Sequence, residues 1–339
     1  MRVRTLVLLI AALPALSASW DRKAAADYLD GRQREWFAWA PANRQGTPCL
    51  SCHTGLPYVI ARPALRRALS ETGPTTFETG LRDGLQARLD RDRHPAPKDA
   101  HAAEAIGVES VMAALLLPKP EAAFERLWLL QWREGPGKGS WPWFALDLDP
   151  WETEDAAFFG ASLAALAVGE APRAIRATAA AREGIAALTA YLRGAEAAQP
   201  LHNRLALLWA STKLPAVMPR KARRALLAEV ARVQQPDGGW SIGSLGPFSV
   251  HAAAPEPARG SDSYATAFTA FVLQRSGIGS NDRVLARALS WLAGHQDPAT
   301  GAWPAPSMNK RYEPGSNQIR FMQDAATGYA VAALLESGR

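Results

Sequence analysis

A repeated order of helix, turn and helix is the feature that most restricts how this chain of 339 residues can fold. Three stretches each read as a helix ending in Gln, a Gly-containing turn, a Trp, and a new helix that opens on Asp. Internal repetition of this kind is typical of folds that stack one supersecondary unit on the next. We therefore expect helical hairpins as the building unit. In chain order, the repeated residues are Gln131–Gly139–Trp141, Gln234–Gly238–Trp240 and Gln296–Gly301–Trp303.

The segments between these turns are rich in Ala and Leu, with apolar residues spaced by three and four. Stretches such as "ESVMAALLL", "AAFERLWLLQW" and "AIRATAAAREGIAALTAYL" follow this spacing, which is typical of amphipathic helices. No convincing run of alternating apolar and polar β-branched residues interrupts them. The sequence therefore predicts an all-α fold.

The residues of the repeated turn have clear physical uses. Gln at a helix C-terminus can satisfy carbonyl groups that lack an intrahelical partner, and Gly permits a left-handed exit from the helix. Trp can cover the turn with a large apolar surface while its N–H still finds an acceptor. We expect each turn to act as a clamp.

The spacing Gln-x-x-x-Gly-x-Trp, met by Gln234, Gly238 and Trp240, resembles the QW motif of squalene–hopene cyclases and oxidosqualene cyclases. The resemblance runs from about Ala103 to the C-terminus, and the other two copies carry insertions between Gln and Gly. It implies an α/α toroid over residues 73–339, the fold shared by those cyclases and the protein prenyltransferases. In that family the QW turns are structural clasps and not catalytic groups.

The second informative feature is "TPCLSCH", which holds the chain's 2 cysteines, Cys49 and Cys52, followed by His53. A disulfide across so small a loop would constrain little chain entropy. The βαβ setting of a thioredoxin-like redox pair is absent from the sequence pattern, and a zinc site would lack ligands. Cys-x-x-Cys-His is the attachment sequence of c-type haem. We predict one covalent haem c on residues 20–72, with thioethers at both cysteines and His53 as the proximal iron ligand.

The stretch from Asp27 to Arg67 is also similar to bacterial secreted proteins that join a c-type haem motif to such a toroid. The N-terminus agrees with export. Residues 1–19 place Arg2 and Arg4 before an apolar run from Leu6 to Leu16 and then small residues, which is the layout of a secretory signal peptide. We expect a periplasmic or secreted protein.

Charge and hydropathy restrict the partners. The formal net charge of +6 includes two arginines of the signal peptide, and no dense basic tract with interleaved aromatics is present, so we expect no nucleic acid. No later segment is apolar enough to span a membrane, which takes roughly 20 residues. Peripheral contact with a membrane remains open.

Acidic residues near the first repeat are candidates for acid catalysis. Cyclases of the resembled family protonate a double bond with an Asp-x-Asp-Asp motif, and the nearest stretch here runs from Glu152 to Asp155. Glu154 would occupy the place of the proton donor, and only Asp155 keeps the residue type. A general acid must lie within hydrogen-bond distance of the atom that it protonates, so the longer Glu side chain weakens this interpretation.

The same aspartate position recurs in every copy, as Asp155, Asp262 and Asp324. Asp at a helix N-terminus is stabilised by free backbone N–H groups and the helix dipole. We therefore expect these residues to be helix caps first. Because they would ring one mouth of the cavity, they are also candidates for binding a ligand or orienting a haem ligand.

The second axial ligand of a haem would separate electron transfer from catalysis. A second strong ligand, as in cytochromes c, suits electron transfer, whereas an open face suits reaction. His251 and Met308 lie in long loops and are the candidates for this position. Pro57, Tyr58 and Ile60 are expected to pack near the haem. Arg62 or Arg66 would either pair with a propionate or face solvent.

Three functions follow from these features. The first is haem-dependent redox work outside the cytoplasm, either electron transfer to a redox partner protein or oxidation of a ligand in the toroid's cavity. The second is an isoprenoid cyclase or isomerase that acts on a hydrophobic or isoprenoid small molecule, with Glu154 and Asp155 as acids and an ancillary haem. The third is a non-enzymatic scaffold that presents haem to a redox partner. A zinc prenyltransferase is disfavoured because the haem motif uses both cysteines.

Overall fold

The computed structural model describes residues 20–44, 46–91, 100–249, 251, 254 and 260–339. The predicted signal peptide, residues 1–19, lies outside the described residues. Nearly all regular structure in the described chain is helical, so the predicted all-α fold is confirmed. The β-structure consists of the short antiparallel pair β1 (Asn43–Arg44) and β2 (Thr47–Pro48), with one isolated bridge between Leu148 and Glu152.

The α-helices are α1 (Arg22–Ala38), α2 (Gly55–Ala68), α3 (Thr76–Arg91), α4 (Ala100–Leu116), α5 (Glu121–Leu130), α6 (Ala156–Glu170), α7 (Arg173–Arg176), α8 (Ala179–Ala195), α9 (Leu201–Ser211), α10 (Arg220–Arg232), α11 (Ser263–Arg275), α12 (Arg283–Ala293) and α13 (Phe321–Glu336). Short 3₁₀ helices cover Ala40–Ala42, Glu196–Ala198, Pro215–Val217, Ile242–Leu245 and Gln318–Arg320.

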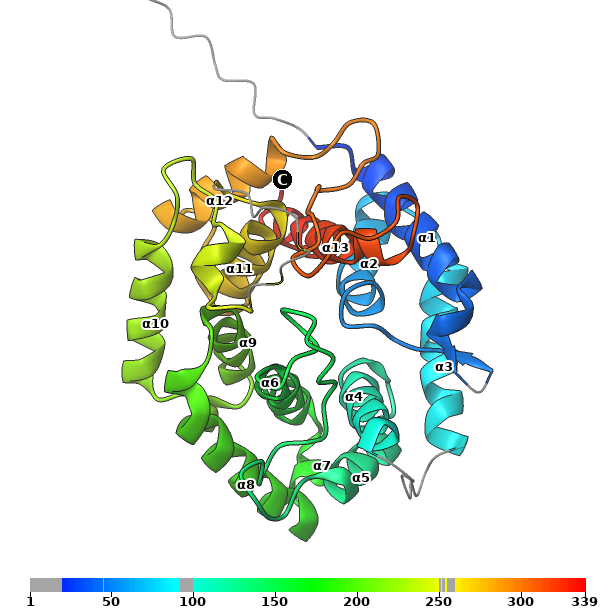
Figure 1. Cartoon of the computed structure of the whole chain (residues 1–339), viewed down its shortest axis with the longest axis vertical. Coiled ribbons are helices and arrows are strands. Elements are labelled where there is room, and N and C mark those ends of the chain that lie inside the picture. The colour runs from blue at the N-terminus through cyan, green and yellow to red at the C-terminus, as the bar shows by residue number, and fades with distance from the viewer. Residues whose placement is uncertain (1–19, 45, 92–99, 250, 252–253, 255–259) are drawn as a thin grey trace, which may run out of the picture.

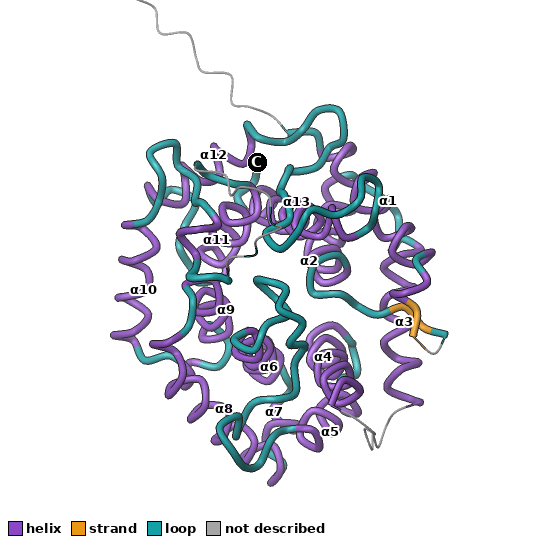
Figure 2. Tube along the Cα trace, viewed as in Figure 1, coloured by secondary structure: helices purple, strands orange, loops and turns teal. Residues whose placement is uncertain are grey.

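The helices form two layers around a common centre (Figure 1). Helices α2, α4, α6, α9, α11 and α13 lie nearer the centre, and α1, α3, α5, α8, α10 and α12 lie outside them. The inner helices pack side by side, for example α13 against α2 and α11, and α6 against α9 and α4. Figure 2 shows the loops that join one layer to the other.

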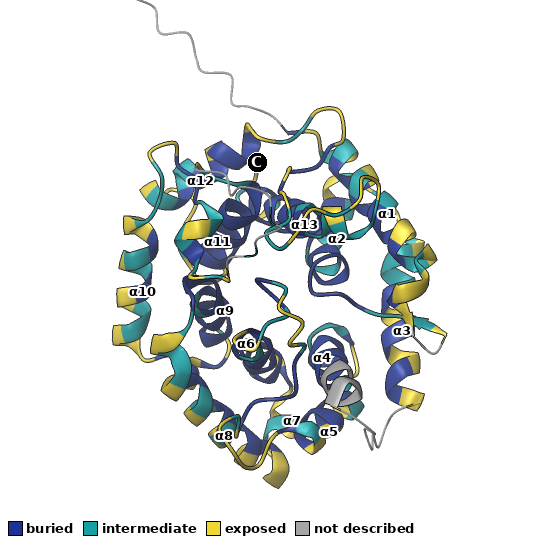
Figure 3. Cartoon of the chain, viewed as in Figure 1, coloured by how far each residue is buried: buried dark blue, intermediate teal, exposed yellow. Residues whose placement is uncertain are grey.

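Burial follows the two layers (Figure 3). Inner helix α6 is buried without a break from Phe158 to Val168, and α11 from Ser263 to Gln274. A helix that is apolar on every side belongs in a core, so the core lies between the inner helices and beneath the outer ones. Residues 20–72 contribute to both layers, because α1 is outer and α2 is inner and packs against α13.

Each repeated Trp fixes the end of the outer helix that precedes it. Trp141, Trp240 and Trp303 are at most 1% exposed, and each indole N–H donates to a carbonyl in the last turn of that helix. Such carbonyls lack intrahelical partners. The acceptors are Leu127 of α5 at 2.6 Å, Val230 of α10 at 2.9 Å and Leu292 of α12 at 2.8 Å.

Each repeated Gln joins two outer helices. The Gln131 side-chain amide donates to the carbonyls of Gly139 in its own turn and of Gly184 in α8, both at 3.0 Å. The expectation that Gln satisfies its own helix end is therefore wrong, because the Trp does so. The other two Gln residues repeat the arrangement: Gln234 donates to Gly238 and Val284, and Gln296 to Gly301 and Asp21. We call each set of Gln, Gly and Trp a clasp.

The Gly of each clasp has a positive φ, 94° at Gly139 and 76° at Gly301. A Cβ at either position would overlap the backbone of the next outer helix, at Ala187 or Ala24. The glycine is thus required both by the turn and by close helix packing.

The third clasp connects the two ends of the described chain. Besides the bond from Gln296 to the Asp21 carbonyl, the Asp21 amide donates to Gln296 Oε1 at 2.6 Å. Beside it, the Arg22 guanidinium donates to the Arg339 carbonyl at 2.9 Å. Helix α1 therefore follows α12 around the outer layer, as Figure 1 shows.

Candidate functional site

His53 lies on the segment between β2 and α2, which Figure 1 shows running from the outer layer to the inner one. His53 is 6% exposed. Its ring stacks on Phe321, the first residue of α13, with 3.7 Å between ring centroids. Trp36 of α1 approaches edge-on at 5.4 Å and donates its indole N–H to the Cys49 carbonyl at 2.7 Å. Aromatic rings therefore hold the Cys-x-x-Cys-His segment at this position.

Hydrogen bonds define the orientation of the His53 ring. Nδ1 of His53 lies 3.0 Å from Thr54 Oγ1, and that hydroxyl donates to Asp324 Oδ2 at 2.8 Å. A threonine hydroxyl has one proton, so a Thr54 that donates to Asp324 accepts from Nδ1–H of His53. The unprotonated nitrogen of the imidazole is then Nε2.

Asp324 is the fixed end of this hydrogen-bond chain. The Arg32 guanidinium holds its carboxylate with two bonds, Nε to Oδ1 at 2.7 Å and Nη2 to Oδ2 at 2.9 Å. The Tyr28 hydroxyl donates to Oδ1 at 2.7 Å. Burial raises the pKa of the Asp324 carboxyl, and the Arg32 guanidinium limits that rise. We call Arg32, Asp324, Thr54 and His53 the histidine network.

The donor set fits a c-type haem. Burial, with a contribution from Arg32, lowers the pKa of His53 to about 3, so the imidazole is neutral, which is the form that binds metals. Metal-binding histidines usually donate their other N–H to a protein group, as His53 does to Thr54. The thiols of Cys49 and Cys52 lie on the segment immediately before His53. Within the described ranges, no group of three or more His, Cys, Asp or Glu side chains is placed to hold a metal ion alone.

A hairpin before α6 extends into the centre beside His53. The Trp151 ring lies 5.8 Å from the His53 ring, and its indole N–H donates to the Tyr264 hydroxyl at 3.1 Å. That hydroxyl lies 2.7 Å from Nε2 of His202, a fully buried residue whose pKa burial lowers to about 4. His53 and His202 are thus two neutral histidines joined through Trp151 and Tyr264.

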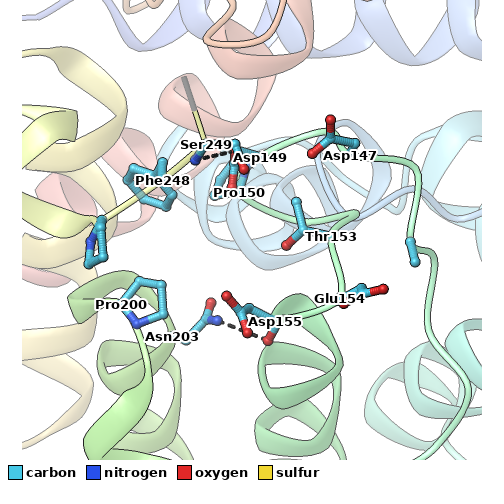
Figure 4. A pocket seen from close by; sticks show the side chains of 12 residues that line it. Asp147, Asp149, Pro150, Thr153, Glu154, Asp155, Pro200, Asn203, Phe248 and Ser249 are labelled. Atoms are coloured by element: carbon cyan, nitrogen blue, oxygen red, sulfur yellow. Dashed lines mark hydrogen bonds between the residues drawn. The ribbon is translucent and has the colours of Figure 1, made fainter. Parts of the chain in front are cut away.

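The predicted acids Glu154 and Asp155 lie at the base of this hairpin and are exposed. Both line a pocket of 570 Å³, shown in Figure 4, together with Asp147 and Asp149. The pocket's lining residues do not include Cys49, Cys52 or His53.

Glu152 is the acid that the sequence argument passed over. Burial raises the pKa of its carboxyl to about 7, and it lies close enough to the Cys52 thiol for a carboxylate there to raise the already high pKa of that thiol. The sequence offered one sign that Glu152 lies near the core, namely its place directly after Trp151, which the structure buries.

The three repeated aspartates differ in role. Asp262 caps α11 as predicted, accepting from the Ala265 amide at 2.8 Å. Asp155 stands at the N-cap position of α6 but its side chain makes no cap hydrogen bond. Asp324 lies within the first turn of α13 and belongs to the histidine network. The expectation of a cap at every copy is wrong for Asp155 and Asp324, because only Asp262 accepts a backbone N–H at its own helix start.

The loops that carry His251 and Met308 meet at Asp149. Nε2 of His251 lies 3.4 Å from Asp149 Oδ2, and the residue after Met308, Asn309, donates to the Asp149 carbonyl at 2.9 Å. Met308 packs against the edge of the core. The structure therefore brings His251, and the loop that carries Met308, to the hairpin that contacts His53, with no described contact between either side chain and His53.

The arginines expected near the haem already have partners. Arg62 is 3% exposed and binds Asp30 with two hydrogen bonds of 3.0 Å, and it also donates to Glu71 at 2.7 Å. Arg66 lies 3.3 Å from Glu78. The prediction that Arg62 faces solvent is wrong, because its side chain is buried and α2 is an inner helix.

The expected packing neighbours point in different directions. Pro57 packs closely on Gly328 of α13, and the Tyr58 hydroxyl donates to Asp30 at 2.9 Å. Ile60 lines a second pocket formed by the C-terminal turns of inner helices.

No family model matches the chain, and no curated protein gives a significant match. Among solved structures, a polysaccharide lyase aligns with 94% of this chain and 90% of its own, at 14% sequence identity and a TM-score of 0.36. A likeness at that level carries no argument about function. In the part of the chain that the structure describes, no helix combines the length and hydropathy needed to cross a membrane.

Proposed function

We propose that this chain is an exported protein with one covalent haem c, built on an α/α toroid like that of the terpenoid cyclases, and that it carries out redox work. The work is either electron transfer with a partner protein or oxidation of a ligand held in the toroid's cavity. The observation that supports this most is the buried, neutral His53, oriented through Thr54 and placed next to the thiols of Cys49 and Cys52. The three clasps support the toroid.

Cys49 and Cys52 would hold the porphyrin, and His53 Nε2 would bind the iron. When bound, a haem supplies one-electron redox chemistry. The protein's own contribution is positional. Arg32 and Asp324 fix the Thr54 hydroxyl, and Thr54 fixes Nδ1–H of His53, which prevents ring rotation and makes Nε2 a stronger donor.

The surroundings of His53 also exclude water. Phe321 covers one face of the imidazole, and Trp36 and Trp151 pack around it. A hydrophobic shell of this kind controls solvent access and redox potential at a metal site. Glu152, with a pKa of about 7, can hold or release a proton at neutral pH within the same region.

The decisive experiment is expression of the full chain with export and haem attachment active, followed by an absorption spectrum and a haem stain after denaturation. We expect c-type Soret and α bands and a stained polypeptide. The Cys49→Ser/Cys52→Ser variant should lose the stain, whereas His53→Ala should keep it with a changed spectrum. An exported, folded protein without covalent haem would overturn the proposal.

Carbon monoxide then separates catalysis from electron transfer. Binding of carbon monoxide to the reduced protein indicates an open iron face and favours ligand oxidation. Its exclusion indicates a second strong ligand and favours electron transfer or a scaffold, and His251→Ala and Met308→Ala identify which loop supplies that ligand.

The second candidate function is an isoprenoid cyclase or isomerase, and the observation in its favour is Glu152. A general acid works best with a pKa near the working pH, and burial brings Glu152 there. For this function we therefore propose Glu152, and not Glu154, as the general acid. With squalene as the substrate, Glu152→Gln should abolish product and Asp155→Asn should retain it. Absence of product with the unmodified chain would exclude this function for squalene.

A further inference from the structure

A second pocket lies at the opposite end of the inner helices from His53. It has a volume of 640 Å³ and is lined by the last turns of α4, α6, α9 and α11. Helix α6 begins next to the pocket of Figure 4 and ends at this one. Its 15 residues, at about 1.5 Å each, separate the two pockets by roughly 22 Å.

Part of the second pocket's wall is apolar, and polar side chains line the rest. Leu116, Leu166, Trp209 and Phe271 line it, together with Ile60 of α2. Trp209 and Phe271 meet edge to face, with 5.0 Å between ring centroids. Such a surface suits the apolar body of a small molecule.

The cations at the rim are already neutralised. Lys213 lies 2.7 Å from Glu170, and Arg275 lies 3.2 Å from Glu336. The C-terminal ends of four helices surround the pocket, and the helix dipole makes such ends unfavourable for anions. The pocket is therefore unsuited to a carboxylate or phosphate, and favours a neutral molecule that donates hydrogen bonds.

One lining residue, Gln274, has a buried polar atom that lacks a partner. Gln274 is 8% exposed, and its Nε2 donates to the Ala333 carbonyl at 3.1 Å. Its Oε1 is buried without a hydrogen-bond donor in the described chain. Buried polar groups are nearly always paired in proteins, so this acceptor indicates a donor that the bare chain does not supply.

We propose that this pocket binds a neutral, hydrophobic alcohol or phenol, with its hydroxyl donating to Gln274 Oε1 and its apolar body against Trp209, Phe271 and Leu166. The site is separate from His53 and does not depend on the presence of haem.

The test is isothermal titration of the purified full chain with two pairs of probes. 1-Decanol is compared with decyl methyl ether, and 2-naphthol with 2-methoxynaphthalene, since each ether keeps the apolar body and loses the donor. We expect an alcohol or phenol to bind about tenfold more tightly than its ether. The pair that shows the preference identifies an aliphatic or an aromatic ligand.

Two variants locate the binding. Gln274→Leu should abolish the preference for the hydroxyl and retain binding of the ether, and Leu116→Trp, at a partly exposed position that lines the pocket, should block both probes. Thermal unfolding followed by circular dichroism checks that each variant is folded. Equal binding of hydroxyl compound and ether, a preference that survives Gln274→Leu, or no binding of any probe would overturn the proposal.

Discussion

The second and third repeats place an aspartate at the start of an inner helix, yet the two residues have different roles. Asp262 accepts backbone N–H groups of Ala265 and Ile242 and caps α11. Asp324 binds Arg32, Tyr28 and Thr54 and is joined through Thr54 to His53. The repeat fixes where the carboxylate lies, and the elements that face it determine what it does.

The largest expected change in the free energy of unfolding comes from removing the Asp324 carboxylate, and removal of the Asp262 carboxylate is the comparison. Asp324→Ala leaves Arg32 buried without its main partner, which should lower the free energy of unfolding by about 3–5 kcal/mol. Asp262→Ala removes a helix cap and should cost about 1 kcal/mol. Urea unfolding of the two variants measures the difference, and equal losses would contradict the separate roles.

The pH dependence of stability tests whether the histidine network, to which the third repeat contributes Asp324, holds a neutral base. The native pKa of His53 is about 3, against 6.5 for an unperturbed imidazole. Below pH 6.5 the unfolded chain therefore takes up a proton that the native state refuses, and stability falls with pH towards 3.

In the haem-free form, and relative to His53→Gln, the unmodified chain should lose about 2.5 kcal/mol between pH 6 and pH 4. His202→Gln is the matched control at a second buried histidine. The native pKa of His202 is about 4, so its contribution to the loss of stability stops growing near pH 4, whereas that of His53 continues towards pH 3. A His53 difference that does not change with pH would show that the native imidazole is protonated in that range.

Thr54 and Thr266 offer a comparison of two buried hydroxyls. Thr54→Val removes the link between His53 and Asp324, and Thr266→Val removes the acceptor of the Trp240 amide. Each should cost about 2 kcal/mol, because a buried partner is left without a hydrogen bond. Only Thr54→Val should change the ¹⁵N chemical shifts of the His53 ring, with Thr54→Ser restoring them. A similar change in Thr266→Val would show that the ¹⁵N shifts of His53 report a general loosening of side-chain packing and not the loss of the Thr54 hydrogen bond.

The smallest effect is expected at Asp155, the aspartate of the first repeat. Because it is exposed and its side chain makes no cap bond, Asp155→Ala should change the free energy of unfolding by less than about 0.5 kcal/mol. A loss comparable to that of Asp262→Ala would restore the capping role that the sequence predicts.

The sequence predicted the parts of this molecule that depend on local pattern. Helices follow from apolar spacing, and the turn geometry follows from Gly139 and its counterparts, because only short-range sterics and hydrogen bonds are involved. Asp262 behaved as its position at a helix start predicts.

What could not be predicted depends on contacts between distant segments. Asp324 and Thr54 are 270 positions apart, and no local pattern indicates that they meet. The burial that raises the pKa of Glu152 arises because the hairpin before α6 extends to the centre, so reasoning from the family motif selected the exposed Glu154 instead. The pocket at Gln274 is likewise formed by the ends of four helices that only packing brings together.

The third clasp has a consequence for how the chain reaches its native state. Gln296 can bind Asp21 only when both the beginning and the end of the described chain are present, and Thr54 can bind Asp324 only when α13 has packed against α2. During synthesis, the early segment with Cys49 and Cys52 would therefore remain open until the last helix arrives. The fold itself would keep both thiols accessible for modification before it buries Cys52.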